Sequence, residues 1–266
     1  MSSRGTCDQR LNWSAGDADP VTVTVPSKED LLADVADRFD RRAGFSVATL
    51  NLDHVVKLRC DPAFRQAYAA HSHVTADGNP IVWLSQLAGQ RGVRLAPGSE
   101  LIAPISALAA QKAVPVALFG ATEASLAQAA TALQERYPGL DVVLTLAPPM
   151  GFDPAGTAAD KAIERLAASG ARLVFLALGA PKQEIFAARA QGQLPETGFL
   201  SIGAGLDFIS GAQVRAPVFV RRLAAEWLWR LVQNPRRLWR RYWGCLMALP
   251  ALALRALSTR LRRQAS

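Results

Sequence analysis

The chain has few cysteines and no long apolar segment. Its three cysteines, Cys7, Cys60 and Cys245, lie far apart and match neither a disulfide framework nor a zinc-ligand spacing, so we expect a reduced, intracellular protein. The first twenty residues contain no apolar run, so no secretory signal is predicted. The longest apolar run near the C-terminus, CLMALPALAL, contains Pro250 and ends at Arg255. It is about half as long as the roughly twenty residues that span a bilayer. We therefore expect that it does not span a membrane.

Acidic residues are nearly absent from the C-terminal segment. Residues 215–266 contain twelve arginines and a single acid, Glu226, a net charge of +11. Because the whole chain carries +8, residues 1–214 carry about −3. Four of the six tryptophans also lie in this segment, within EWLWRLVQNPRRLWRRYWG. Clustered cationic and aromatic side chains are typical of nucleic-acid binding, of membrane surfaces and of sites for phosphorylated substrates. The segment by itself does not discriminate among the three.

Half of the residues are apolar, which indicates a globular protein, and short apolar runs alternate with stretches of helical periodicity. This alternation predicts an α/β fold: a Rossmann-like, largely parallel sheet with helices on both faces, followed by a basic helical appendage. The predicted strands are residues 21–25, 45–51, 71–76, 115–120, 141–146, 172–179 and 199–205, and the predicted helices are residues 28–42, 80–90, 100–113, 124–137, 158–170 and 182–191.

We divide the chain into a loose leader (residues 1–20), a catalytic core (residues 21–214) and an Arg/Trp-rich appendage (residues 215–266). In open parallel sheets, ligands bind beyond the carboxyl ends of the strands. The residues that directly follow each predicted strand are therefore the first candidates for a functional site.

Polar residues follow two of the predicted strands near the N-terminus. Thr49 and Asn51 are two positions apart, so on a strand they share one face. Asp77 lies in the segment DGNP, in which Gly78 permits a tight turn and Pro80 favours the start of a helix. Asp77 is thus either a site carboxylate or an ordinary turn or N-cap acid.

Two later strands end in glycine. In LALGAPKQE, Gly179 closes a strand and a helix then begins with Gln183 and Glu184 in its first turn, where free amides attract anions. Glu184 has an alternative role, since an acid there also complements the helix dipole. In SIGAGLDFISG, Gly203 permits a close backbone approach and Asp207 follows.

In this order along residues 45–242, the blocks TLN, DGNPIVW, LFGA, YPGL, LALGAPKQE, GAGLDFISG, RAP and EWLWRLVQNPRRLWRRY resemble the WecG/TagA/CpsF family of bacterial glycosyltransferases, glycosyltransferase family 26. The resemblance implies transfer of a sugar from a UDP-sugar to a polyprenyl-diphosphate-linked glycan precursor, with inversion at the anomeric carbon and without a metal or other cofactor. The donated sugar stays open among N-acetylmannosamine, its uronic acid and glucose.

The resemblance also assigns roles to residues. It implies that Asp77 is the general base, with Thr49 and Asn51 as a polar pair beside it. Phe152 matches an aromatic that stacks on uracil, although a loop aromatic that fills the core is an equal alternative. The residues expected around the UDP group are Gly179, Gln183, Gly203 and Asp207 from the core and Arg230, Arg237 and Arg240 from the appendage.

Physical chemistry supports these roles. A carboxylate is ionised at neutral pH and can take the proton of an attacking hydroxyl, as single-step inversion requires. The departing diphosphate needs a cation, and arginine binds phosphate oxygens with two parallel hydrogen bonds. Arg230, Arg237 and Arg240 have helical spacing, but we expect Pro235 to interrupt their helix. The one Asp-x-Asp sequence, residues 17–19, lies in the leader and is interpreted as a solvated pair.

The rest of the appendage favours a membrane surface. Tryptophan, tyrosine and arginine prefer the bilayer interface and anionic headgroups. We expect Trp239 and Trp243 to be exposed and Trp227 to pack on the core. The protein is then peripheral on the inner face of the cell membrane, with a UDP-sugar, a lipid-linked acceptor and anionic lipid as partners. Apolar residues expected on an interfacial helix are Leu246, Met247, Leu249, Leu252 and Leu254.

Other interpretations receive less support. His71 and His73 are predicted to share a strand face, but no third metal ligand is in view. A nucleic-acid-binding protein explains the basic tail, whereas the core is acidic and contains no recognition motif, so no nucleic-acid partner is expected. A dinucleotide-dependent oxidoreductase lacks its glycine-rich motif. Glu100 stands where the family usually has aspartate, which leaves the donor sugar less determined. The oligomeric state is open, and a homo-oligomer is compatible with the sequence.

Overall fold

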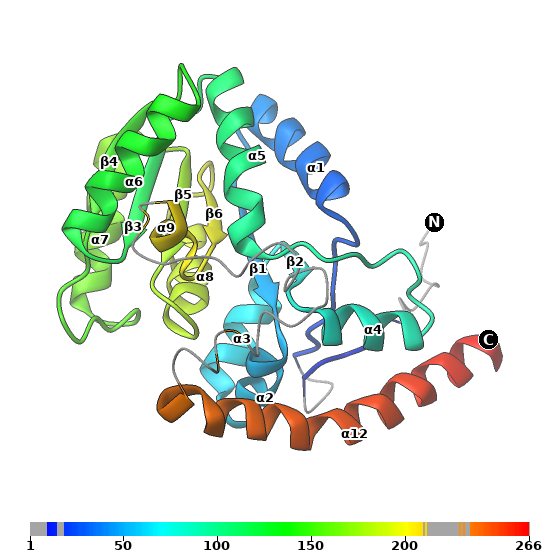
Figure 1. Ribbon diagram of the computed structural model, residues 1–266. Helices are drawn as coiled ribbons and strands as arrows, with labels where there is room; N and C mark the ends of the chain where they lie inside the picture. Colours follow the sequence, from blue (N-terminus) through cyan, green and yellow to red (C-terminus); the bar gives the residue numbers. More distant parts are fainter. Residues whose placement is uncertain are drawn as a thin grey trace.

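The centre of the molecule is a six-stranded, wholly parallel sheet with the strand order β2-β1-β6-β5-β3-β4 (Figure 1). The structure is a computed structural model that describes residues 10–14, 19–209, 211, 229, 231 and 235–265. The strands are β1 (Phe45–Leu50), β2 (His73–Ala76), β3 (Val116–Gly120), β4 (Val142–Leu146), β5 (Leu173–Ala177) and β6 (Gly198–Ser201). Six of the seven predicted strands are thus confirmed.

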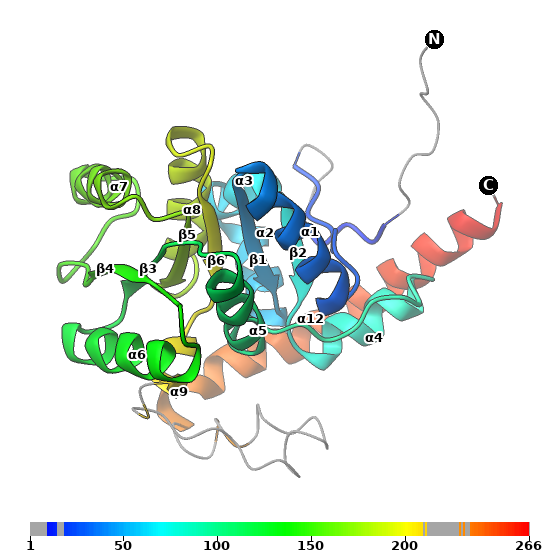
Figure 2. The ribbon, with the colours of Figure 1, turned by 90° about the horizontal axis from the view of Figure 1, so that it is seen from above.

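Both faces of the sheet are covered by helices, as predicted. Every residue of β1, β2, β3 and β6 is buried, as expected of a parallel sheet between two helical layers, whereas the edge strand β4 is partly exposed. Figure 2 shows the two layers, with α5 and α6 on one side of the sheet and α7 and α8 on the other. α1 packs in one cluster with α5 and α6, and α3 packs against α8. The helices of the core are α1 (Lys28–Arg41), α2 (Leu52–Cys60), α3 (Pro62–Ala70), α4 (Asn79–Leu87), α5 (Gly98–Gln111), α6 (Glu123–Arg136), α7 (Thr157–Ser169), α8 (Lys182–Gln193) and α9 (Gly205–Ile209).

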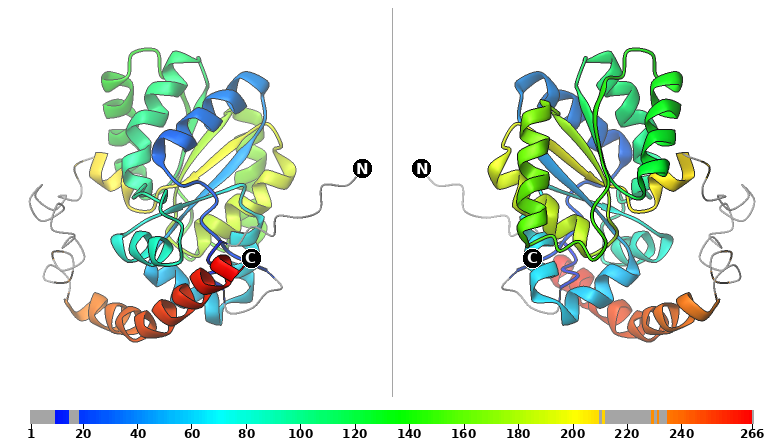
Figure 3. Two further views of the ribbon diagram at one scale, coloured as in Figure 1. Left: turned by 90° about the vertical axis from the view of Figure 1, so that its right-hand side faces the viewer. Right: turned by 90° about the vertical axis from the view of Figure 1, so that its left-hand side faces the viewer.

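The long helix α12 (Pro235–Ala265) forms the end of the appendage and lies along α2 and α4 (Figure 1, Figure 3). Its inward face buries small and medium apolar side chains, among them Ala248, Leu252 and Ala256, in one cluster with residues of α2, α3 and α4. The helix begins at Pro235, because the first turn of a helix has no partner for the missing N–H. Arg237 and Arg240 therefore lie on α12, whereas Arg230 precedes it and lies outside the described residues. Pro250, within the apolar run, lies inside the helix without ending it.

By length and composition alone, the segment Leu238–Gln264 of α12 is long and apolar enough to cross a membrane. The apolar run in the sequence was expected to be too short to cross a membrane, but the helix as a whole is long enough by this criterion. Leu252 and Ala256 are nevertheless buried against the core, and the Arg255 guanidinium donates to the Ser14 carbonyl. A membrane-crossing orientation would have to break these contacts, whereas an orientation along the surface preserves them.

The N-terminal residues depart from the prediction. Residues 21–25 are extended but form no strand, because the amides of Thr24 and Val25 both donate to the single Val74 carbonyl, at 3.0 and 3.2 Å, instead of forming a ladder. The alternating valines that suggested a strand are nevertheless buried on one side of this segment: Val21, Val23 and Val25. Part of the expected loose leader is also packed: Leu11 and Trp13 are fully buried in the cluster that contains α2 and α4.

Candidate active site

Four neighbouring strands bring the predicted polar residues to one side of the sheet, here called the carboxyl edge because the strands end there. The strands β2, β1, β6 and β5 are adjacent in the sheet, and each is followed by one of the predicted motifs. Leu50 pairs with Ala76 in the parallel register, and the Asp77 amide donates to the Leu50 carbonyl at 2.7 Å. Asn51 and Asp77 therefore follow neighbouring strands at the same level.

Thr49 and Asn51 are held by contacts on either side of β1. Thr49 is buried, and its methyl group lies 3.5 Å from the position that a Cβ on Gly98 would occupy. The same Cβ would lie 2.7 Å from the Ser201 carbonyl oxygen, so only glycine lets the start of α5 approach β6 this closely. Asn51 is the N-cap of α2, with its side-chain oxygen accepting from the His54 amide at 3.0 Å. This cap orients the Asn51 carboxamide at the carboxyl edge.

Asp77 lies in the turn between β2 and α4 and is half-buried. The N-cap of α4 is Gly78, at φ 99°, so Asp77 is not the N-cap acid of that helix. Its carboxylate lies close enough to Tyr68 of α3 to affect that phenol electrostatically. Burial raises the pKa of Tyr68 well above its ordinary value, and the charges of Glu184 and Asp77 raise it further. Asp77 and Glu184 thus flank the same buried tyrosine from two different strand ends.

Gln183 links two strand ends. Its side-chain oxygen accepts from the Gly203 amide at 3.2 Å, and its side-chain nitrogen donates to Glu184 Oε1 at 2.9 Å. Glu184 is fully buried rather than exposed at the helix end, and its Oε2 has no hydrogen-bond partner among the described residues. Burial raises the pKa of Glu184 to about 7, against the opposing effects of the Gln183 hydrogen bond and the Lys57 charge. The sequence indicated an acid at this position but not its burial.

Phe152 is part of the core. Its ring is buried and packs edge-on against Phe119, with centroids 5.5 Å apart, and against Phe186 at 6.2 Å. This arrangement favours the core alternative for Phe152 over stacking on uracil, because neither ring face is open in this conformation.

The basic helix α12 is anchored next to the carboxyl edge. Arg241 Nε lies 3.2 Å from Asp53 Oδ1, and Lys57 Nζ lies 2.8 Å from the other oxygen of the same carboxylate. Asp53 is two residues beyond Asn51, so this ion pair holds the appendage beside the predicted base. Arg241 was missed by the sequence analysis, although Asp53 in the first turn of α2 was an available signal for a cationic partner.

The remaining appendage residues are only partly described. Arg240 is exposed, with its guanidinium carbon 5.8 Å from the centroid of the Trp239 ring. Arg230 and Trp227, together with the side chains of Arg237 and Asp207, lie outside the described residues.

Trp239 and Trp243 are 54% and 58% exposed, as predicted. Leu252 is instead buried and Leu249 packs partly on the core, because they lie on the inward face of α12. The exposed apolar residues lie at helical spacing along one face of the helix, here called the apolar stripe: Trp239, Trp243, Leu246, Met247, Leu254, Leu257 and Leu261.

The predicted histidines have separate structural partners. His71 caps α3 instead of lying on β2, and its Nδ1 lies 2.7 Å from the Ala67 carbonyl oxygen. His73 Nε2 lies 2.6 Å from an Asp34 carboxylate oxygen. Within the described part of the chain, no group of three or more His, Cys, Asp or Glu residues is arranged to hold a metal ion.

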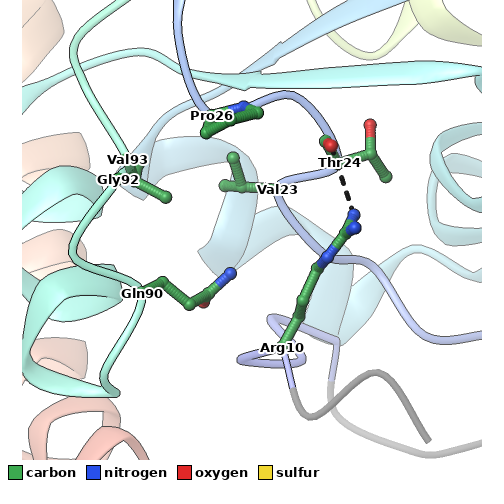
Figure 4. A pocket seen from close by; sticks show the side chains of 7 residues that line it. All are labelled: Arg10, Val23, Thr24, Pro26, Gln90, Gly92 and Val93. Carbon is green, nitrogen blue, oxygen red and sulfur yellow. Dashed lines mark hydrogen bonds between the residues drawn. The ribbon is translucent and has the colours of Figure 1, made fainter. Parts of the chain in front are cut away.

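A hollow of about 130 Å³ lies elsewhere, between the N-terminal segment and the loop after α4 (Figure 4). Arg10 lines it and donates to the Thr24 carbonyl at 3.2 Å, opposite Gln90. None of the predicted site residues lines this hollow.

Sequence comparisons identify the relatives of the chain. Residues 19–266 match the model of the glycosyl transferase WecG/TagA/CpsF family. The chain belongs to this family. A protein of Bacillus spizizenii (strain ATCC 23059 / NRRL B-14472 / W23) is 27% identical over 203 residues, 76% of each chain. A protein of Bacillus subtilis (strain 168) is 25% identical over 220 residues, 82% of this chain and 81% of the relative. Both relatives are named N-acetylglucosaminyldiphosphoundecaprenol N-acetyl-beta-D-mannosaminyltransferase.

Membership of the WecG/TagA/CpsF family confirms the resemblance found in the sequence, and it makes the protein a glycosyltransferase. The match extends through α12, so the appendage belongs to the family's common sequence rather than being an unrelated extension. The individual roles of Asp77, the Thr49–Asn51 pair and the UDP-binding residues stay predictions.

Proposed function

We propose that the protein transfers N-acetylmannosamine from a UDP-sugar to a polyprenyl-diphosphate-linked N-acetylglucosamine acceptor at the inner face of the cell membrane. The acceptor and the sugar follow the names of the two relatives. The observation that carries the proposal is the placement of Asp77 beside Asn51 at the carboxyl edge, with α12 tied to the same edge through Arg241 and Asp53.

Asp77 is the proposed general base. In a single inverting step, a hydroxyl oxygen of the acceptor attacks the anomeric carbon of the donor while its proton passes to the Asp77 carboxylate. The bond from the anomeric carbon to the diphosphate oxygen breaks at the same time, and UDP leaves with the electron pair. Asp77 suits this role because it is half-buried and sits in a turn whose backbone is fixed by Leu50.

The departing UDP gains negative charge, which the basic appendage is proposed to neutralise. Arg230, Arg237 and Arg240 are the predicted contacts, and guanidinium groups match the geometry of phosphate oxygens. Support comes from the position of α12, which packs on α2 and α4, the helices that directly follow Asn51 and Asp77. Gln183 and the Gly203 backbone, which follow β5 and β6 farther along the carboxyl edge from Asp77, are proposed to bind the nucleotide.

The apolar stripe is the proposed membrane contact. Its seven side chains point away from the core on one face of α12, and arginines flank them, including Arg236, Arg240 and Arg262. An amphipathic helix of this kind lies in the headgroup region with its apolar face inserted and its arginines among anionic lipids. This orientation brings the carboxyl edge close to the bilayer in which the lipid-linked acceptor is anchored.

The direct test is a transfer assay with the purified full-length protein. UDP-N-acetylmannosamine and undecaprenyl-diphosphate-N-acetylglucosamine are supplied in vesicles that contain anionic lipid, and the disaccharide lipid and UDP are measured, with the Bacillus subtilis relative as the positive control. We expect equal amounts of the two products. If the relative forms product under these conditions and this protein forms none, the assigned substrates are wrong.

A further inference from the structure

A chain of hydrogen bonds joins the interior of the core to the backbone that follows β6. It runs from Glu184 Oε1 to the Gln183 side-chain nitrogen at 2.9 Å, and from the Gln183 side-chain oxygen to the Gly203 amide at 3.2 Å. Both side chains are almost completely removed from solvent. Gly203 has φ 55°, so it occupies the left-handed region, which its hydrogen bond to Gln183 helps to hold. These hydrogen bonds are therefore suited to fixing one conformation of residues 202–206, here called the Gly203 loop.

The orientation of the Gln183 amide in this series of hydrogen bonds depends on whether Glu184 is ionised or protonated. An ionised carboxylate only accepts hydrogen bonds, so it faces the Gln183 NH₂ group and leaves the Gln183 oxygen for the Gly203 amide. Hydrogen bonds to an ionised acceptor are also stronger than those between neutral groups. A protonated carboxyl can donate as well as accept. It therefore permits the Gln183 amide to rotate, which removes the acceptor from Gly203.

The neighbours of Glu184 place its titration in an accessible range. Lys57 from α2 stabilises the carboxylate. Tyr68 from α3, whose hydroxyl lies 2.9 Å from His54 Nδ1, is near enough that its pKa, raised first by burial, is raised further by the charges of Glu184 and Asp77. Burial outweighs the Lys57 charge and the Gln183 hydrogen bond and brings the pKa of Glu184 to about 7.

Two of the histidines titrate well below this range, and the third is shifted in the same direction. Burial lowers the pKa of His54 to about 3 and that of His71 to about 4, and burial lowers the pKa of His73 despite the opposing charge of Asp34. A change in behaviour between pH 6 and 8 is therefore attributable to Glu184 before His54 or His71.

We propose that Glu184 is a positioning residue, which acts through Gln183 to fix the Gly203 backbone and thereby makes binding of the UDP-sugar depend on its ionisation. The inference rests on the proposed function, because it takes the Gly203 loop to be part of the nucleotide site. Glu184 itself is buried and touches no substrate; its effect passes entirely through the orientation of the Gln183 amide.

The first test is the affinity for UDP-N-acetylmannosamine, measured by calorimetry at pH 6 and pH 8 for the wild type, E184Q and E164Q. A diphosphate diester does not change its charge in this range. A single group of pKa about 7 is about one-tenth ionised at pH 6 and nine-tenths at pH 8, so the wild type should bind up to about tenfold tighter at pH 8. E184Q should stay near the weak, low-pH affinity at both values. E164Q, a neutralised exposed glutamate on α7, should behave as the wild type.

The second test needs no ligand. Amide hydrogen exchange of the segment 202–206 is compared at pH 8, where loss of the Gln183 hydrogen bond in E184Q should make the Gly203 amide exchange faster than in the wild type and E164Q. Thermal unfolding at pH 8 serves as a control. E184Q should unfold at no lower temperature than the wild type, since the buried carboxylate is disfavoured at that pH.

The two tests separate the possible failures. If E184Q exchanges and binds as the wild type does, with the same dependence on pH, the positioning role is overturned while the donor assignment stands. If Gly203 is deprotected in E184Q but no variant, including the wild type, binds the UDP-sugar, Glu184 does hold the loop and the proposed donor is wrong. The inference is supported if E184Q, unlike the wild type and E164Q, loses both the exchange protection of the Gly203 amide and the pH dependence of UDP-sugar binding.

Discussion

Replacing Leu254 and Leu261 with serine should detach the protein from membranes without unfolding it. These two leucines of the apolar stripe are 69% and 66% exposed, so they make little contribution to the core. Membrane insertion would bury the remaining two-thirds of each side chain. Serine keeps the charge of α12 unchanged, so the double variant tests apolar insertion separately from attraction between arginine and lipid.

The size of the effect follows from the exposed area. Full burial of a leucine side chain is worth about 1.5–3 kcal/mol, so two-thirds of two leucines corresponds to about 2–4 kcal/mol. Binding to vesicles should therefore weaken by about thirtyfold or more. The matched control is M150S, because Met150 is fully exposed in the loop after β4 and is not part of the stripe.

The assay is co-sedimentation with vesicles of increasing anionic lipid content, together with a thermal unfolding curve for each variant. We expect M150S to bind as the wild type and the double leucine variant to remain in the supernatant at lipid concentrations that sediment the wild type. Equal sedimentation of all three proteins would refute the assignment of the stripe to the membrane.

Two further predictions concern the core and the appendage. Burial lowers the pKa of His54 to about 3 and that of His71 to about 4. Below pH 6.5 the unfolded chain therefore binds two protons that the folded chain does not bind, so the free energy of unfolding decreases as pH falls. Glu184, with its raised pKa, offsets about one of these protons between pH 7 and 4.5, so the net loss from these groups between pH 6.5 and 4.5 should be about 2–3 kcal/mol. Urea unfolding at both pH values measures this loss, which should be smaller in H71Q; a wild type equally stable at both would contradict the burial argument. R241A removes one of the two cations on Asp53 and should lower stability by about 1 kcal/mol or less because the pair is partly exposed, yet reduce the transfer rate several-fold by loosening α12. Transfer rates and melting temperatures measured side by side test this, and an unchanged rate would show that the anchor at Asp53 is not needed.

The sheet was predictable because buried parallel strands are almost continuously apolar. Residues 21–25 misled the prediction because alternating valines indicate a half-buried extended segment, and alternation does not reveal whether the backbone finds a complete partner strand. The sequence analysis did not predict the helices α2 and α3, although it predicted α4, which has the same length. Their caps were visible, however: Asn51 accepts from His54, and Asp61 accepts from the Phe64 amide with Pro62 at the first turn.

The position of the site was predictable in part. Parallel strands all end on one side, so polar residues after β1, β2, β5 and β6 had to meet at one edge. The burial of Glu184 and Phe152 was not predictable, because it depends on how α8 packs against α3 and how the loop after β4 folds onto Phe119. Nor does the sequence show that Arg241, rather than its neighbour Arg240, turns toward Asp53.

The transfer rate of D77N, measured with its affinity for the donor, tests the proposed chemistry most directly. Asparagine keeps the shape of the side chain but takes no proton from the acceptor hydroxyl. The rate should therefore fall by about two to four orders of magnitude, while UDP-N-acetylmannosamine binds within about twofold of the wild type. A D77N enzyme that transfers sugar at close to the wild-type rate would show that another group accepts the proton.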